Sequence, residues 1–381
     1  MKIIRKATIP FFILRDICLP LRINKTNRIE ALQKAMKWLC YAQDRGGGGG
    51  VSEGYDLRKG WLPPFPETTG YIVPTFLDYY HFTGDSMYKN RAVEMLEWLL
   101  SVQRDNGAIS GIIEGAKSPL VFDTGQVLLG FVRGYKETNE ERYLAAAEKA
   151  GDWLVSIQNP DGKWDRNVYQ NIVHSYNVRV AWALLELNEI LPKKKYFNAA
   201  NRNVVWTLTQ QQDNGWFNYN KFEKNTPVYT HALGYVTRGI LEAGILLNNP
   251  NFISAAQKTA DILLSLQREN GALPGSFDSK WNPTTRSVCL TGSAQVGIVW
   301  LRFYQITSAS KYFNAAKLGN SFLIKTQERI PFPSLRGAVK GSHPIYGNYL
   351  TFVYPNWAAK FFVDALLLEI AVTKQNSIGK I

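Results

Sequence analysis

A short phrase occurs six times along the chain, and it limits the folds that this sequence can adopt. In each copy a large apolar residue stands five positions before a glutamine, and the glutamines follow one another at intervals of 60, 55, 53, 56 and 60 residues. So steady a period is typical of a repeat architecture, in which each unit buries its apolar face against its neighbours. The copies are Trp38–Gln43, Trp98–Gln103, Trp153–Gln158, Trp206–Gln211, Ile262–Gln267 and Phe322–Gln327.

Each repeat predicts two helices. The segment that ends in the phrase has charged residues on one side and apolar residues on the other, which is typical of a half-exposed helix. A break and a loop follow, and the next segment has few charges, which is typical of a buried helix. We therefore expect outer helices at residues 27–43, 85–103, 140–158, 196–211, 251–267 and 311–327, and inner helices at 68–82, 123–137, 176–191, 231–247, 291–306 and 356–371.

This strict alternation predicts an all-α fold, a closed (α/α)6 barrel of six hairpins, in preference to an open solenoid. The length of 381 residues alone would allow two or three domains. The repeat favours one domain, because a single hairpin cannot bury its own apolar face. We expect that domain to span residues 27–374, after an N-terminal arm of residues 1–26 and before a C-terminal tail of residues 375–381.

The arm combines basic residues with the apolar run Pro10–Leu14. Arg15 and Asp16 end this run too early for a secretory signal or a membrane span. The arm would either dock on the barrel or touch a membrane surface, and we expect docking. The three cysteines show no spacing for a metal site or a disulfide framework, so we expect a cytoplasmic protein without a metal or cofactor.

The connections indicate where a site lies. Links from an inner helix to the next outer helix are short turns, whereas links from an outer to an inner helix span about 12 to 28 residues. Loops beyond about 12 residues in a compact domain are usually functional. All the long loops meet at the end of the barrel where the inner helices begin, and we expect the site at this mouth.

Four residues at the starts of inner helices are the predicted catalytic groups. Glu67 and Asp123 belong to adjacent hairpins, and two carboxyls across one cavity can act as general acid and base. Each could instead only cap its helix. His174 and His231 begin the third and fourth inner helices and are candidates for proton transfer, with a structural role as the alternative.

Further polar and aromatic residues are expected at the mouth. Most of them lie in the first turns of helices that are otherwise nearly free of polar groups, and buried polar groups are costly unless they have partners. They therefore predict a water-filled cavity that binds a ligand. The predicted substrate-binding residues are Tyr71, Gln126, Arg179, Tyr235, Arg238, Gln295, His343 and Trp357.

The formal charge of +13 favours an anionic partner, which could be an acidic glycan or an anionic membrane surface. No nucleic-acid-binding motif is present in the sequence, so nucleic acid is not expected. Aromatic residues on Gly-rich loops above a polar cavity are suited to stacking on sugar rings. We expect an acidic oligosaccharide or polysaccharide as the ligand.

With its six hairpins, the chain resembles the six-hairpin glycosidase-like superfamily over about residues 27–374. Four strings also resemble uncharacterised helical-toroid proteins associated with polysaccharide biosynthesis, so other proteins of such a system are expected partners. The strings are Pro66-Glu-Thr-Thr-Gly-Tyr71, Phe122-Asp-Thr-Gly-Gln126, Cys289-Leu-Thr-Gly-Ser-Ala-Gln295 and Tyr354-Pro-Asn-Trp-Ala-Ala-Lys360. The superfamily includes glycoside hydrolases, among them unsaturated-uronate hydrolases. Related toroids include polysaccharide lyases, uronate C5-epimerases and sugar 2-epimerases.

The resemblance implies different roles for different reactions. In a uronate hydrolase, Asp123 would protonate the substrate oxygen while Glu67 or His231 activates water. In a lyase or C5-epimerase, Tyr71, Tyr235 or His174 would remove the proton at C5. A third hypothesis is a glycan-binding or scaffold protein without catalytic activity. We favour the hydrolase.

The string Gln158-Asn-Pro-Asp-Gly-Lys-Trp164 is similar to the QW repeat of squalene and terpene cyclases. Those cyclases protonate their substrate with a DxDD motif, and no such string occurs in this sequence. We interpret the similarity as shared toroid construction.

Overall fold

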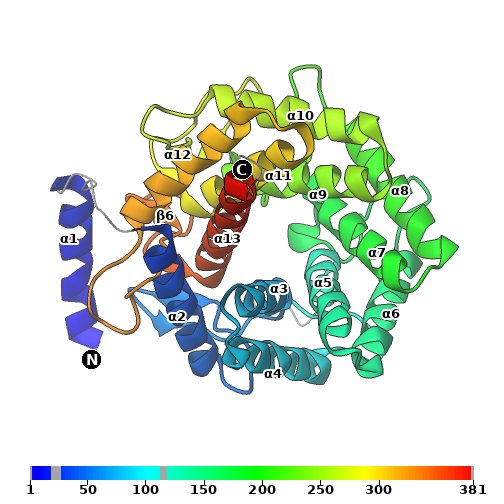
Figure 1. Cartoon of the computed structure of the whole chain (residues 1–381), viewed down its shortest axis with the longest axis horizontal. Helices are drawn as coiled ribbons and strands as arrows, with labels where there is room; N and C mark the ends of the chain where they lie inside the picture. The colour runs from blue at the N-terminus through cyan, green and yellow to red at the C-terminus, as the bar shows by residue number, and fades with distance from the viewer. Residues whose placement is uncertain (1, 19–26, 112–117, 379–381) are drawn as a thin grey trace.

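Two concentric rings of helices form the body of the protein (Figure 1). The computed structural model describes residues 2–18, 27–111 and 118–378. The outer helices are α2 (Arg28–Gly46), α4 (Ser86–Val102), α6 (Glu141–Ser156), α8 (Lys194–Thr209), α10 (Pro250–Ser265) and α12 (Ser310–Thr326). The inner helices are α3 (Pro66–Thr83), α5 (Val121–Thr138), α7 (Val178–Ile190), α9 (Thr230–Leu246), α11 (Leu290–Thr307) and α13 (Asn356–Ile378). The predicted all-α (α/α)6 barrel is confirmed.

The inner ring is closed. Each inner helix contacts the inner helices before and after it, and α13 contacts α3, so the last hairpin meets the first. Each outer helix packs on the inner helix that precedes it in the chain, and α2 packs on α13. The last helix continues to Ile378, past the expected start of a tail at residue 375.

The repeated glutamine connects neighbouring hairpins. The side-chain amide of Gln158 donates to the carbonyl of Gly162 at 3.0 Å and to that of Ala199, on the next outer helix, at 2.9 Å. Gln327 makes the equivalent bonds to Gly337 at 3.0 Å and to Ala31 at 2.9 Å, which join the last hairpin to the first. These contacts explain why the sequence repeats the residue at a fixed position.

The turn after the phrase requires glycine where the chain approaches the next helix. Gly271 has a φ of +90°, and a Cβ there would lie 2.4 Å from the carbonyl oxygen of Leu318. Glycine also sets the distance between α3 and α5. A Cβ on Gly70 would lie 2.6 Å from the Cα of Val127, and one on Gly130 would lie 2.5 Å from the carbonyl oxygen of Gly70. These two helices therefore pack backbone against backbone.

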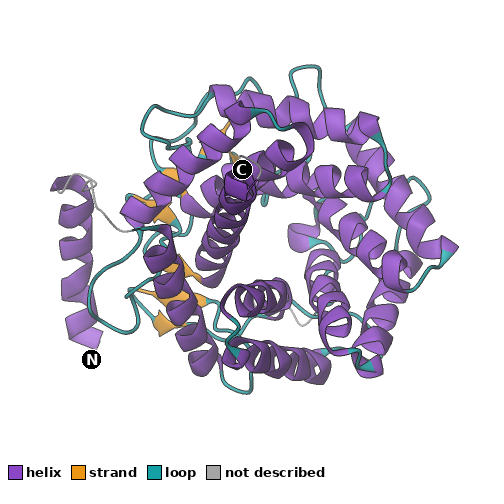
Figure 2. Cartoon of the chain, in the orientation of Figure 1, coloured by secondary structure: helices purple, strands orange, loops and turns teal. Residues whose placement is uncertain are grey.

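Short strands connect the long loops at the mouth (Figure 2). Strands β1 (Gly54–Asp56), β2 (Gly60–Trp61) and β7 (Val353–Pro355) form an antiparallel sheet in the order β2-β1-β7, which joins the first loop to the last. Strand β3 (Val228–Tyr229) pairs with β4 (Ser276–Phe277), and β5 (Val288–Cys289) pairs with β6 (Ser342–His343). These strands are not predictable from the sequence, because two or three residues carry no readable periodicity.

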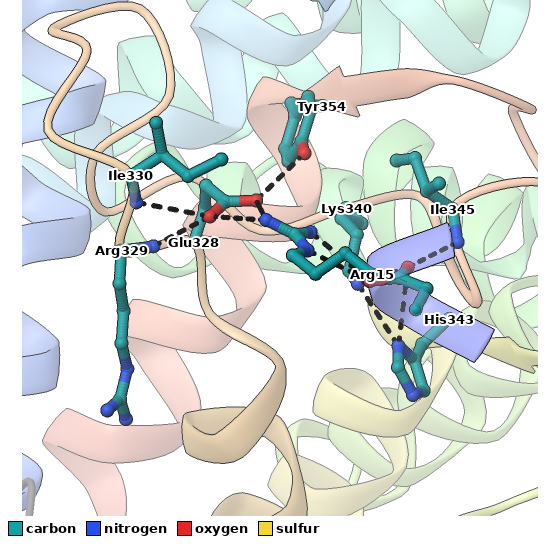
Figure 3. A network of polar contacts seen from close by, with 9 residues as sticks. Arg15, Glu328, Arg329, Ile330, Lys340, His343, Ile345 and Tyr354 are labelled. Carbon is teal, nitrogen blue, oxygen red and sulfur yellow. Dashed lines mark hydrogen bonds and ion pairs between the residues drawn. The ribbon is translucent and has the colours of Figure 1, made fainter. Parts of the chain in front are cut away.

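The N-terminal helix α1 (Lys2–Cys18) lies outside the ring (Figure 1). Phe12 is buried, and Arg15 donates to Glu328 at 2.8 and 2.9 Å (Figure 3). Asp16 accepts from the buried Lys340 at 2.6 Å. Contacts of α1 with the barrel are thus partly charged. Within the described ranges, no helix combines the length and apolarity needed to cross a bilayer.

Candidate active site

A cavity of about 410 Å³ opens at the starts of the inner helices, and we call it the mouth cavity. Its walls are mostly aromatic, with four carboxyl side chains among them, Glu53, Glu67, Asp123 and Glu223. Six of the residues predicted from the sequence line it, namely Glu67, Tyr71, Asp123, His231, Tyr235 and Trp357. Their presence in one cavity agrees with the expected position of the site, and their roles remain predictions.

Asp123 lies in the first turn of α5 and is only 3% exposed. One of its carboxyl oxygens, Oδ2, has no hydrogen-bond partner in the described part of the chain. Burial raises the pKa of Asp123 to about 7. The free oxygen is therefore available to a ligand or to water in the cavity.

Glu67 lies in the first turn of α3, across the tight α3–α5 contact from Asp123. Burial, and then the charge of Asp123, raise the pKa of Glu67 well above its usual value. Like charges that are close together and shielded from water cannot both ionise easily. The two carboxyls thus titrate as a pair, and the pair retains a proton near neutral pH.

Glu53 is a third acid of the mouth cavity, and it was not among the residues predicted from the sequence. Burial raises its pKa too. Its backbone is held by a bond from its N–H to the carbonyl of Pro63 and by a bond from the N–H of Asn356 to its carbonyl. Glu53 lies in a loop that no helical pattern marks, and the pairing of β1 with β2 and β7 fixes the segment beside it.

His231 is connected to a chain of hydrogen bonds. Trp357 Nε1 donates to the hydroxyl of Tyr349 at 2.9 Å, and that hydroxyl is bonded to His231 Nδ1. Because the Tyr349 proton needs an acceptor in this buried position, Nδ1 accepts it, and the ring carries its own proton on Nε2. Burial lowers the pKa of His231 well below its usual value, so the ring is neutral. Nε2 has no partner in the described chain and lies in a residue that lines the cavity.

The other two predicted histidines lie elsewhere. The ring of His174 lies between the carbonyls of Lys221, at 2.9 Å, and Tyr169, at 2.8 Å, and stacks on Tyr176. Burial lowers the pKa of His174 to about 4. His343 accepts from Lys340 at 3.1 Å, beside the contacts of α1 (Figure 3). Neither ring lines the mouth cavity, which differs from the expectation.

Four predicted substrate-binding residues also lie outside the mouth cavity. Arg179 and Arg238 line a second cavity of about 390 Å³ inside the ring, which we call the basal cavity. Gln126 accepts from Arg179 Nε at 3.0 Å. Gln295 packs against Gly234, where an added Cβ would lie 2.4 Å from its Oε1. Neither glutamine lines the mouth cavity or the basal cavity.

The charge of the mouth cavity follows from these positions. Among the described residues that line it there is no lysine or arginine. Its aromatic wall includes Phe122, whose ring contacts Tyr176 at 5.1 Å and Tyr235 at 5.0 Å between centroids. The described residues also contain no cluster of three histidine, cysteine, aspartate or glutamate side chains that could hold a metal ion. The cavity offers carboxyl groups, one neutral imidazole and aromatic surfaces.

Comparison with known proteins agrees with the fold. The squalene-hopene cyclase C-terminal domain matches residues 62–235, which is less than half of the chain. No curated protein sequence gives a significant match. Many solved structures do match, at low sequence identity.

An unsaturated glucuronyl hydrolase specific for heparin has a TM-score of 0.72 at 16% identity, over 91% of this chain and 98% of that one. A glycosaminoglycan-degrading unsaturated glucuronyl hydrolase from Bacillus sp. GL1 has a TM-score of 0.70 at 14% identity, over 90% and 96%. The cellobiose 2-epimerase of Bacillus thermoamylovorans has a TM-score of 0.69 at 12% identity, over 94% and 99%.

The fold is therefore that of a six-hairpin glycosidase-like (α/α)6 toroid. Glycoside hydrolases and sugar epimerases share this fold with the chain. At these identities the likeness establishes the fold alone.

Proposed function

We propose that this protein is a glycoside hydrolase that cleaves a saccharide in the mouth cavity, with Glu67 and Asp123 as the catalytic carboxyls. One observation carries the proposal: two carboxyls of adjacent hairpins, the buried Asp123 and the half-buried Glu67, line the same cavity, and desolvation raises the pKa of both. A pair of carboxyl groups, one protonated and one ionised, provides the catalytic groups of most glycoside hydrolases.

The electrostatics favours one assignment of roles. Glu67, whose pKa is raised both by burial and by Asp123, keeps the proton and donates it to the leaving oxygen. Asp123, with a pKa of about 7, is partly ionised at neutral pH and either takes a proton from water or attacks the sugar. This assignment reverses the order in which the sequence resemblance used the two acids.

His231 supplies a hydrogen bond in this proposal. Its Nε2–H is a buried donor without a partner in the described chain, at the wall of the cavity. A neutral ring with this tautomer cannot take a proton from water at Nε2. His231 therefore holds a substrate oxygen and leaves the acid–base work to the carboxyls.

The charges of the mouth cavity favour an uncharged sugar ring at the reacting position. Four carboxyl side chains and no lysine or arginine are among its described lining residues, so a uronate carboxylate would meet like charge. Aromatic side chains such as Tyr229 and Trp357 can pack on the apolar faces of such a ring.

Hydrolysis of an unsaturated glucuronyl saccharide is the second candidate, and the likeness to glucuronyl hydrolases favours it. In that reaction the substrate carboxylate would have to accept hydrogen bonds from protonated Glu53 or Glu67. Activity on the uronate would therefore fall as pH rises and these groups lose their protons.

The test uses matched neutral, uronate and unsaturated-uronate oligosaccharides in heavy water, with products identified by mass spectrometry and proton NMR. We expect shortened saccharides, and we expect Glu67→Gln and Asp123→Asn to lower kcat/KM by about 10²- to 10⁴-fold. Glu269→Gln is the control, because Glu269 is an exposed carboxyl in the loop between α10 and α11.

Other products would replace the proposal. Unsaturated ends would establish elimination, and deuterium at C5 without cleavage would establish epimerisation. Binding without any product, equal in the wild type and Asp123→Asn, would show a glycan-binding protein.

A further inference from the structure

The basal cavity is separate from the proposed reaction site. Side chains from α3, α5, α7, α9 and α13 line it, and Tyr71 lines both cavities. The basal cavity contains the basic side chains that the mouth cavity lacks, including Arg179, Arg238 and Lys360. The two cavities within one ring therefore differ in charge.

Arg179 is the central group of the basal cavity. It is 4% exposed, and its Nε donates to Gln126 at 3.0 Å. No carboxylate in the described chain forms an ion pair with it. Its guanidinium lies 5.1 Å from the ring of Trp182 and 4.9 Å from that of Tyr235. Ring faces stabilise the charge, but they leave the terminal N–H groups without oxygen acceptors.

The other cations of the basal cavity have carboxylate partners. Lys360, which is 6% exposed, pairs with Asp364 one turn further along α13. The pairs at the rim are Arg133 with Asp78 at 2.8 Å and Lys136 with Glu186 at 2.7 Å. None of these carboxylates is free to neutralise Arg179.

Arg238 shares its partner. Glu242 accepts from Arg238 at 2.5 Å and from Arg302 at 2.9 Å, so two guanidinium groups divide one carboxylate. The described lining of the basal cavity therefore has five cations, namely Arg179 with Arg133, Lys136, Arg238 and Lys360, against three carboxylates, and Glu242 and Arg302 lie outside the lining. Uncompensated charge in a partly buried site is costly, and an anion with two negative charges would offset it.

We propose that the basal cavity binds a phosphate or sulfate group, held by Arg179 and Arg238. Guanidinium groups bind such oxyanions through paired N–H bonds. The guanidinium of Arg238 lies 5.3 Å from the ring of Trp182, so both arginines contact the same indole. The volume of about 390 Å³ and the apolar residues Leu129, Val132 and Phe361 leave space for an organic group esterified to the oxyanion.

The experiment titrates the full-length protein with inorganic phosphate, sulfate and a hexose 1-phosphate at constant ionic strength. Isothermal calorimetry gives the Kd, and thermal unfolding gives the shift in Tm. We expect saturable binding with a rise in Tm. Arg179→Gln should weaken binding by about tenfold or more, the loss expected when hydrogen bonds to a charged group disappear.

Two further variants make the outcome decisive. Arg238→Gln, at a side chain that is 21% exposed, replaces Arg179→Gln if the latter does not fold, and it should weaken binding too. Arg142→Gln removes the same charge from the exposed side of α6 and should bind as the wild type does. Tighter binding of the hexose 1-phosphate than of phosphate would identify a phosphate ester as the ligand, and equal binding would identify the free anion.

The proposal is overturned if phosphate and sulfate shift Tm no more than chloride does. It is also overturned if Arg179→Gln and Arg238→Gln bind as tightly as the wild type. Neither result bears on hydrolysis in the mouth cavity, because the arginines do not line that cavity.

Discussion

The hydrogen bonds from Trp357 through Tyr349 decide which nitrogen of His231 carries the proton. We expect the ring to stay neutral, with its proton on Nε2, between pH 8 and pH 5, because burial lowers its pKa well below the usual value. Long-range ¹H–¹⁵N correlation spectra would show this, with His231→Gln used to assign the signal. In Tyr349→Phe the preference for Nε2–H should be lost. A proton on Nδ1 in the wild type, or a charge change near pH 6.5, would contradict this interpretation.

Asp123 makes stability depend on pH. Its pKa is about 7 in the folded state and near 3.8 when exposed, so between these values the folded state holds more protons. The free energy of unfolding therefore falls as pH rises from about 4 to about 7. The loss is at most about 4 kcal/mol at 1.36 kcal/mol per pKa unit. Asp123→Asn should reduce this loss of stability, which urea unfolding at pH 5 and pH 8 would measure. If the difference in the free energy of unfolding between these pH values is the same in the variant and the wild type, the burial of a charge at Asp123 is contradicted.

Sequence reasoning could find Glu67 and Asp123, because each lies in the first turn of an inner helix and the two helices belong to adjacent repeats. It could not assign Arg179 and Arg238 to a cavity. Position along a helix is readable from the repeat, whereas the direction of a side chain depends on how the helix is rotated within the ring. Glu53 could not be predicted from the sequence, since long-range contacts determine the position of a loop residue.

Among the helices, the bonds of the repeated glutamine make a stability prediction. Gln327→Ala would leave the carbonyls of Ala31 and Gly337 without the side-chain donor that joins the last hairpin to the first. Leaving a buried acceptor unpaired costs about 1 to 3 kcal/mol. Urea unfolding should show a loss of this size. Gln33→Ala, at an exposed position on α2, should stay within about 0.5 kcal/mol, and equal losses in both variants would contradict the proposed role of the phrase.

The helices were predictable because each has a long periodic pattern and the glutamine phrase repeats that pattern six times. The predicted inner helix at residues 123–137 corresponds to α5 at Val121–Thr138, for example. The strands were not predictable. Pairs such as Val288 with His343 join segments far apart in the chain, and no local signal encodes such a pairing.

The closed ring predicts how the whole molecule unfolds. Deleting residues 310–381 removes α12 and α13 and uncovers the faces of α2, α3 and α11. We expect this variant to lose its cooperative thermal transition, whereas an open solenoid would keep its remaining hairpins folded. Circular dichroism and calorimetry would measure the transition.

The control for that experiment deletes residues 2–18. Helix α1 lies outside the ring, so this variant should keep a single transition. Its Tm should fall, because Glu328 and Lys340 lose their partners Arg15 and Asp16. A cooperative transition in the first variant would show that the hairpins fold without closure.

The contact between α3 and α5 has a consequence for the stereochemistry of the proposed reaction. Gly70 and Gly130 allow the backbones to touch, and Glu67 begins one of the helices while Asp123 begins the other. A methyl group at Gly70 would push the two helices apart and move the carboxyls with them. In glycosidases the gap between the carboxyls selects retention or inversion at the anomeric carbon. Gly70, which does not line the mouth cavity, would thereby determine which anomer of the sugar is released.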